Sequence, residues 1–325
     1  MPAIFLAIRT NTPNLLLYMN LLFPESIANR PNGTQLIYLF FIVIICFSLA
    51  QLLSLGAFVL SGTDLSTLEN TDWSKATDSQ VNIYKIAQII SSIFTLLVPA
   101  WLYSMAQSGN TRFLQFKQPL VPFLLTLTLL TTLVSLPFLG YTMQLNQNMQ
   151  LPAFLAPIEQ WMKTTEANLA DLTAAFLKMD NLFELLLNMV MIAVIPALGE
   201  EMLFRGCLQP TLQRYTGNAH AGIWLAAIIF SAIHLQFYGF IPRLLLGALF
   251  GYFYLWSGNL WYPVIAHFIN NGLQVLMVYI GVVSATDLDT TEQDMPLVAV
   301  AISGLLTVAM LLQYKNKSSY SDIKL

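Results

Sequence analysis

The chain has 325 residues, of which 56% are hydrophobic and only 10% are charged, and its formal net charge is −3. Soluble domains carry about 25% charged residues, so this composition excludes an ordinary water-soluble domain and predicts a membrane protein. No block of basic residues is present, which argues against nucleic acid as a partner.

Long apolar segments recur along the chain, and most of them approach the roughly 20 residues that a membrane-spanning helix needs. We expect about eight spanning helices, over residues 36–60, 81–106, 119–143, 182–214, 221–238, 241–256, 260–283 and 295–314. The sequence therefore predicts an all-α fold and a polytopic, multi-pass integral membrane protein. Membrane lipids surround it, those of the cell membrane if the source is bacterial.

The polar segments between the apolar ones divide the chain into four parts. Residues 1–35 are expected to form an interfacial N-terminal segment, and residues 36–181 the N-terminal transmembrane helices. The second part includes residues 151–179, whose apolar positions recur at helical spacing and predict an amphipathic helix on the membrane surface. Residues 182–283 form the predicted catalytic core, and residues 284–325 the last transmembrane helix and a polar tail. No internal repeat is evident, so an inverted-repeat transporter gains no support.

Two adjacent carboxylates, Glu200 and Glu201, lie in the otherwise apolar fourth segment. An ionised side chain at bilayer depth costs roughly 2.5–3.5 kcal/mol on insertion scales. Glu201 has a partner in Arg205, four residues later, in the favourable acid-before-base order. Glu200 has no neighbouring cation in the sequence. A carboxylate in this situation predicts a functional site.

The three histidines add to this site. His220 lies in the connection before the fifth segment, His234 inside that segment, and His267 inside the seventh. Glu200 and His234 are equally far in sequence from Gly217, where a turn is expected. If the fourth and fifth helices are antiparallel neighbours, these two side chains lie at matching depth.

Asn271 follows His267 by four residues, on the same helical face, with Asn270 beside it. The alternative for either membrane-depth histidine is a packed core residue bonded to a backbone carbonyl. The joint depth of Glu200, His234, His267 and Asn271 instead predicts a polar catalytic or ion-binding centre.

The residues singled out so far form three motifs, which are, in chain order, Glu200-Glu201-x-x-x-Arg205, Phe230-x-x-x-His234 and His267-x-x-x-Asn271. These motifs and their order resemble those of the CAAX-processing and bacteriocin-processing (CPBP) intramembrane endopeptidases, the family that includes the protease trimming prenylated CAAX proteins. The similarity covers about residues 182–276, and residues 1–180 carry no matching motif.

The resemblance implies a role for each of these residues. Amide hydrolysis needs an activated water and hydrogen-bond donors for the oxyanion that forms. Glu200 is implied as general base, and His234 as the residue that holds or deprotonates the water. His267 and Asn271 are implied as oxyanion donors. Glu201 and Arg205 are implied as a structural pair, and Phe230 is expected to pack.

A metal ion is the open point of this site. Two histidines and a glutamate form a common zinc set, so Glu200, His234 and His267 would be the ligands if zinc is bound. The family is often classed as metalloproteases, but the His-Glu-x-x-His spacing of soluble zinc proteases is absent. The resemblance also implies a glutamate-dependent mechanism that needs no metal, and we favour it.

The expected function is an intramembrane endopeptidase acting on a lipidated, CAAX-type protein or a small membrane-associated peptide. A proton- or ion-coupled transporter could use the same buried carboxylate and histidines. An inactive scaffold or immunity protein of the same family is the third hypothesis. Cys207 lies beside the acidic motif and could be a thiol nucleophile, but a buried cysteine more often acts as a small hydrophobe.

Overall fold

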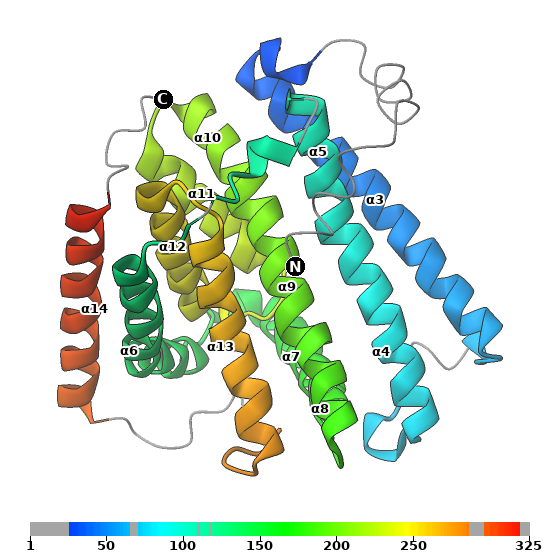
Figure 1. Ribbon diagram of the computed structural model, residues 1–325. Coiled ribbons are helices and arrows are strands. Elements are labelled where there is room, and N and C mark those ends of the chain that lie inside the picture. Colours follow the sequence, from blue (N-terminus) through cyan, green and yellow to red (C-terminus); the bar gives the residue numbers. More distant parts are fainter. Residues whose placement is uncertain (1–25, 66–70, 109–110, 118, 286–295, 319–325) are drawn as a thin grey trace.

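A computed structural model describes residues 26–65, 71–108, 111–117, 119–285 and 296–318. Within these residues all regular elements are helical (Figure 1). Six helices are long and apolar enough to cross a membrane, which confirms an all-α, multi-pass membrane protein. They are α3 (Asn32–Leu60), the α4–α5 helix (Asp78–Gln107), α6 (Pro122–Gln147), the α8–α10 helix (Leu182–Thr216), α12 (Phe240–Ser257) and α14 (Leu297–Lys317).

The predicted count of eight spans is not confirmed, because the fifth and seventh segments differ from expectation. The predicted helix over residues 221–238 is α11 (Ala219–Ala232), with only 14 residues. At 1.5 Å per residue it is about 21 Å long, shorter than the roughly 30 Å of the hydrocarbon layer. The seventh, α13 (Trp261–Tyr279), is long enough but is not among the six apolar helices, since it includes histidine, glutamine and two asparagines.

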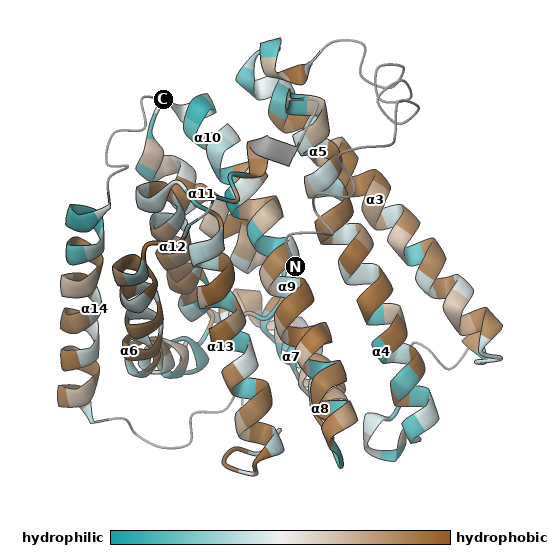
Figure 2. Ribbon diagram, in the orientation of Figure 1, coloured by the Kyte–Doolittle hydropathy of each residue, from teal (hydrophilic) through white to brown (hydrophobic). Residues whose placement is uncertain are grey.

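The α8–α10 helix runs through the middle of the bundle (Figure 1). It is continuous but changes type along its length, and its parts are α8 (Leu182–Asn188), η7 (Met189–Val194), α9 (Ile195–Glu200), η8 (Glu201–Leu208) and α10 (Gln209–Thr216). On one side of it lie α3, α4 (Asp78–Ser92), the π-helix η4 (Ile93–Leu97) and α5 (Val98–Ser108). On the other side lie α11, α12 and α13, with α6 and α14 paired beyond them. Hydrophobic residues cover the helices, and hydrophilic residues gather towards the two ends of the bundle (Figure 2).

Two glycines let α12 lie against α11 and the central helix. A β-carbon on Gly251 would stand 2.8 Å from Ile223 and 2.9 Å from Oε1 of Gln209. On Gly247 it would stand 3.3 Å from Phe230. Small residues at such positions allow helix backbones to approach closely in membranes. The α12 backbone therefore comes within hydrogen-bonding reach of polar side chains on the central helix.

The predicted amphipathic segment contains helix α7 (Ala156–Phe176), preceded by the short η6 (Ala153–Leu155). Its helical character is confirmed, while its position on the membrane surface stays a prediction. Residues 1–25 of the predicted interfacial segment lie outside the described residues, and residues 27–29 form a short 3₁₀ turn, η1 (Ile27–Asn29). Further short turns are η3 (Trp73–Lys75) and η5 (Thr111–Leu114).

Candidate active site

The acidic motif lies where the central helix changes from α- to π-helical geometry. Glu200 is the last residue of α9, and Glu201 is the first residue of the π-helix η8. A second π-helix, η7, ends directly before α9 begins. Such π turns are rare in helices and occur often at functional sites. Glu200 and Glu201 therefore stand at an irregular part of the helix.

Glu201 is fully buried and joins two other residues of the motifs. Its Oε1 accepts hydrogen bonds from Nη1 of Arg205 and from Nδ1 of His267, both at 2.8 Å. Nη2 of Arg205 donates to the carbonyl of Gly247 at 2.9 Å. The predicted Glu201–Arg205 pair is therefore confirmed. The hydrogen bond to His267 is an additional contact, and it joins residues 66 positions apart.

Glu200 faces the other nitrogen of the same imidazole. Its Oε2 lies 3.7 Å from Nε2 of His267, and its side chain retains 14% exposure, whereas that of Glu201 retains none. A distance of 3.7 Å is longer than a direct hydrogen bond. The two adjacent carboxylates thus lie next to different nitrogens of the His267 ring. Glu201 fixes His267 from the protein interior, and Glu200 lies on the more accessible side of the ring.

His234 is not inside a helix, which corrects the prediction. Helix α11 ends at Ala232, and His234 lies in the following turn. Its Nδ1 lies 2.7 Å from the carbonyl oxygen of Phe230. Because a carbonyl oxygen only accepts hydrogen bonds, Nδ1 carries the proton and Nε2 is left as an acceptor in the neutral ring.

Phe230 packs between the functional groups, as expected. Its ring centroid lies 4.9 Å from that of His234 and 6.3 Å from that of His267. The guanidinium carbon of Arg205 lies 4.7 Å from the same ring, within the range of a cation–π contact. One aromatic side chain thus contacts the imidazoles of the turn and of α13.

Asn271 is bound to the central helix. Its Nδ2 donates to the carbonyl of Ile192 at 3.0 Å, and its Oδ1 accepts from Nδ2 of Asn270 at 3.1 Å. Position 196 is a proline, which has no amide hydrogen to donate to the carbonyl four residues earlier. The Asn271 amide therefore supplies a donor where Pro196 cannot. One of its two amide hydrogens remains for another acceptor.

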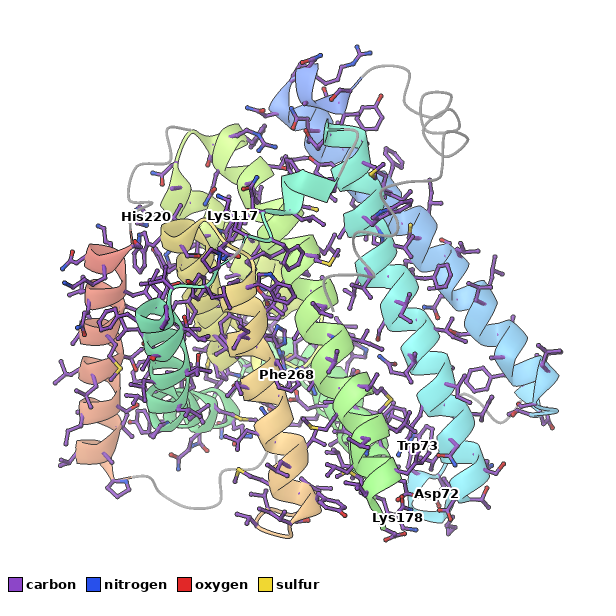
Figure 3. All side chains as sticks on the ribbon, in the orientation of Figure 1. Asp72, Trp73, Lys117, Lys178, His220 and Phe268 are labelled. Atoms are coloured by element: carbon purple, nitrogen blue, oxygen red, sulfur yellow. The ribbon has the colours of Figure 1, made fainter. Side chains whose placement is uncertain are left out.

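The remaining polar residues singled out in the sequence have other environments. His220 is exposed, with its Nδ1 2.9 Å from the hydroxyl of Tyr252. Figure 3 shows it near one end of the bundle, with Lys178 near the other and Phe268, the neighbour of His267, between them. Cys207 is fully buried, and its thiol contacts the carbonyl of Ala100 at 3.6 Å. Its environment is that of a small hydrophobe.

The three predicted zinc ligands do not form a metal site among the described residues. Among the described residues, no three His, Cys, Asp or Glu side chains converge closely enough to hold a metal ion. Nδ1 of His267 is bonded to Glu201 and Nδ1 of His234 to a carbonyl, so each ring has its Nε2 left for another partner. Zinc at Glu200, His234 and His267 stays a prediction, and we assign no reaction step to a metal.

Comparisons with known proteins bear on the same part of the chain. Residues 182–273 match the family described as type II CAAX prenyl endopeptidase Rce1-like. The uncharacterized protein YpbD of Bacillus subtilis (strain 168) is 37% identical over 86 residues, which is 25% of this chain and 41% of that protein. The chain thus matches less than half the length of this relative. No solved structure matches significantly.

The matched segment contains the acidic motif, His234, His267 and Asn271. The family match thus covers the same residues that the three motifs indicated. The protein that carries them is a multi-pass membrane protein. Residues 182–273 of the chain are therefore similar to the Rce1-like type II CAAX prenyl endopeptidases.

Proposed function

We propose that the protein is an intramembrane endopeptidase that hydrolyses a peptide bond near the C-terminus of a lipidated, CAAX-type protein or a small membrane-associated peptide. The observation that carries this proposal is the approach of Oε2 of Glu200 to Nε2 of His267 at 3.7 Å, with Glu201 fixing the opposite nitrogen. A base and a hydrogen-bond donor then face one small space, which is what attack of water on an amide requires.

Glu200 is the general base in this reaction. It accepts a proton from a water molecule while the water oxygen bonds to the scissile carbonyl carbon, and the carbonyl oxygen becomes an oxyanion. Glu200 then passes the proton to the leaving nitrogen as the carbon–nitrogen bond breaks. The products are a new carboxyl group and a new amine, and Glu200 returns to its starting form.

His267 and Asn271 stabilise the oxyanion. Nε2–H of His267 is one donor to the oxyanion, and the second amide hydrogen of Asn271 is the other. His234, whose Nε2 is an acceptor, holds the attacking water in line with Glu200.

The family implies a peptide or prenylated protein as substrate. The test is incubation of the purified protein in detergent with a labelled farnesylated CAAX peptide, with the same peptide lacking the farnesyl group, and with each in the presence of a chelator. We expect two fragments whose masses sum to the peptide plus one water, more of them from the farnesylated peptide, and no effect of the chelator.

Two results would overturn the proposal. An intact peptide in every reaction, together with proton uptake by liposomes containing the protein, would identify a transporter. Cleavage lost with the chelator and restored by zinc would contradict the metal-free reaction.

A further inference from the structure

The turn that carries His234 has a backbone conformation that its sequence does not favour. This turn, residues 233–239 and here called the His234 turn, connects α11 to α12. Leu235, directly after the histidine, has a φ of 54°. The left-handed region is sterically unfavourable for a residue that has a β-carbon. Such a conformation persists only where the surrounding structure holds it.

A carboxylate from outside the matched family segment holds this turn. Oε2 of Glu166, on helix α7, accepts the amide hydrogens of Phe237 at 3.0 Å and Tyr238 at 3.2 Å. Hydrogen bonds to an ionised acceptor are roughly twice as strong as bonds between neutral groups. The two amides lie two and three residues after Leu235, so Glu166 fixes the chain immediately beyond its left-handed residue.

Further side chains contact Phe237 in the His234 turn. Nδ2 of Asn146, at the end of α6, donates to the carbonyl of Phe237 at 2.6 Å. The ring of Trp161, also on α7, lies 5.1 Å from that of Phe237. Both peptide groups around Phe237 are therefore engaged by side chains from α6 and α7. Glu166 contributes the carboxylate of this set, and its Oε2 accepts both amide hydrogens.

We propose that Glu166 is a positioning residue for His234. By holding the amides of Phe237 and Tyr238, it keeps Leu235 left-handed and so keeps Nδ1 of His234 bonded to the Phe230 carbonyl, which leaves Nε2 as the acceptor nitrogen. Without this carboxylate, Leu235 relaxes to an ordinary backbone conformation, and the preceding residue rotates with it. The consequence for hydrolysis rests on the proposed function, but the effect on the orientation of His234 does not.

The structural part is tested by NMR of protein labelled in its histidine rings. The chain has three histidines, so His220→Gln, His234→Gln and His267→Gln assign the signals. We expect Glu166→Ala to shift the ring signals of His234 and leave those of His220 and His267 in place. Glu166→Gln, which keeps one acceptor oxygen, should give a smaller shift and serves if the alanine variant does not fold.

The matched control is Glu159→Ala. Glu159 is on the same helix, pairs with Lys163 at 2.7 Å, and is ionised because that hydrogen bond lowers its pKa. We expect this variant to leave all three histidine signals unchanged. An unmoved His234 signal in folded Glu166→Ala or Glu166→Gln protein would overturn the proposal, as would an equal shift in Glu159→Ala.

The kinetic part uses the farnesylated CAAX peptide. Since a misplacement of about 1 Å can cost on the order of 100-fold in rate, we expect Glu166→Ala to lower kcat by roughly 10- to 100-fold with KM little changed. Glu166→Gln should recover part of this loss. A rise in KM at constant kcat would contradict positioning. If wild-type protein cleaves nothing while the His234 signal still shifts, the proposed function fails and the positioning of His234 by Glu166 stands.

Discussion

Replacing Glu201 by alanine removes one acceptor that two buried donors share. Nη1 of Arg205 and Nδ1 of His267 both lie 2.8 Å from Oε1 of Glu201, and both side chains are at most 5% exposed. Deleting one partner of a buried ion pair typically costs about 3–5 kcal/mol, because the other charge is left uncompensated. The orphaned His267 donor adds about 1–3 kcal/mol.

These two costs do not add fully, because the arginine keeps other contacts. Arg205 retains its hydrogen bond to the Gly247 carbonyl and its place over the Phe230 ring. We therefore expect Glu201→Ala to lower the free energy of unfolding by about 4 kcal/mol. That is a large part of the roughly 5–15 kcal/mol by which a folded protein is stable.

The assay is unfolding in detergent by heat and by denaturant. Glu201→Gln keeps one acceptor oxygen, so it should lose less than Glu201→Ala. The double variant Glu201→Ala with Arg205→Met removes the orphaned charge and should be more stable than Glu201→Ala alone. A Glu201→Ala variant as stable as wild type would refute the assigned role of this pair. So would a double variant whose free energy of unfolding falls by the sum of the losses in the two single variants.

Two further predictions concern packing and the proline of the central helix. A β-carbon on Gly199 would stand 2.7 Å from the β-carbon of a leucine on η4, so Gly199→Ala should cost about 1–3 kcal/mol in the same unfolding assay. Gly56→Ala, where nothing lies within 4 Å, is the control and should cost nothing. Asn271→Ala should cost about 1–3 kcal/mol by leaving the carbonyl of Ile192 without this donor, and adding Pro196→Ala, which supplies an amide hydrogen, should restore part of that loss. An equal loss with and without the alanine at 196 would contradict this explanation.

Much of the fold could be predicted because its signals are local. Long apolar runs with few charges predicted six of the spanning helices nearly to their ends. The i,i+4 spacing placed Glu201 against Arg205, and Gly217 ends the central helix with a φ of 65°, at the expected turn. Each of these features depends on residues within a few positions of one another.

The features that the sequence did not predict depend on distant contacts. Nothing between positions 232 and 236 signals the end of a helix, because Leu235 becomes left-handed next to a segment held by Glu166 and Asn146. That is why His234 was expected inside a helix. The hydrogen bond from His267 to Glu201 crosses between two helices. The position of the Glu201 carboxylate depends on the change from α- to π-helical geometry in the central helix, which the spacing of apolar residues does not predict.

The sequence predicted only part of the environment of Asn271. Its spacing from His267 correctly placed both on α13, one turn apart. Its bond to the carbonyl of Ile192 depends on Pro196 and on the pairing of α13 with the central helix. A proline in an apolar run predicts an unpaired carbonyl, and an asparagine on a neighbouring helix could satisfy it. The predicted polar centre indicated that these helices meet, but it did not show which carbonyl Asn271 contacts.

The most direct measurement is single-turnover cleavage of the farnesylated CAAX peptide by wild-type protein and by Glu200→Gln, with peptide binding followed by fluorescence anisotropy. Glutamine has nearly the shape of glutamate but cannot accept the proton of the attacking water. We expect the cleavage rate to fall by roughly 10²- to 10⁴-fold, the usual contribution of a general base, with the Kd for the peptide unchanged. Cleavage by Glu200→Gln at a rate within a few-fold of wild type would contradict the assignment of Glu200 as the base.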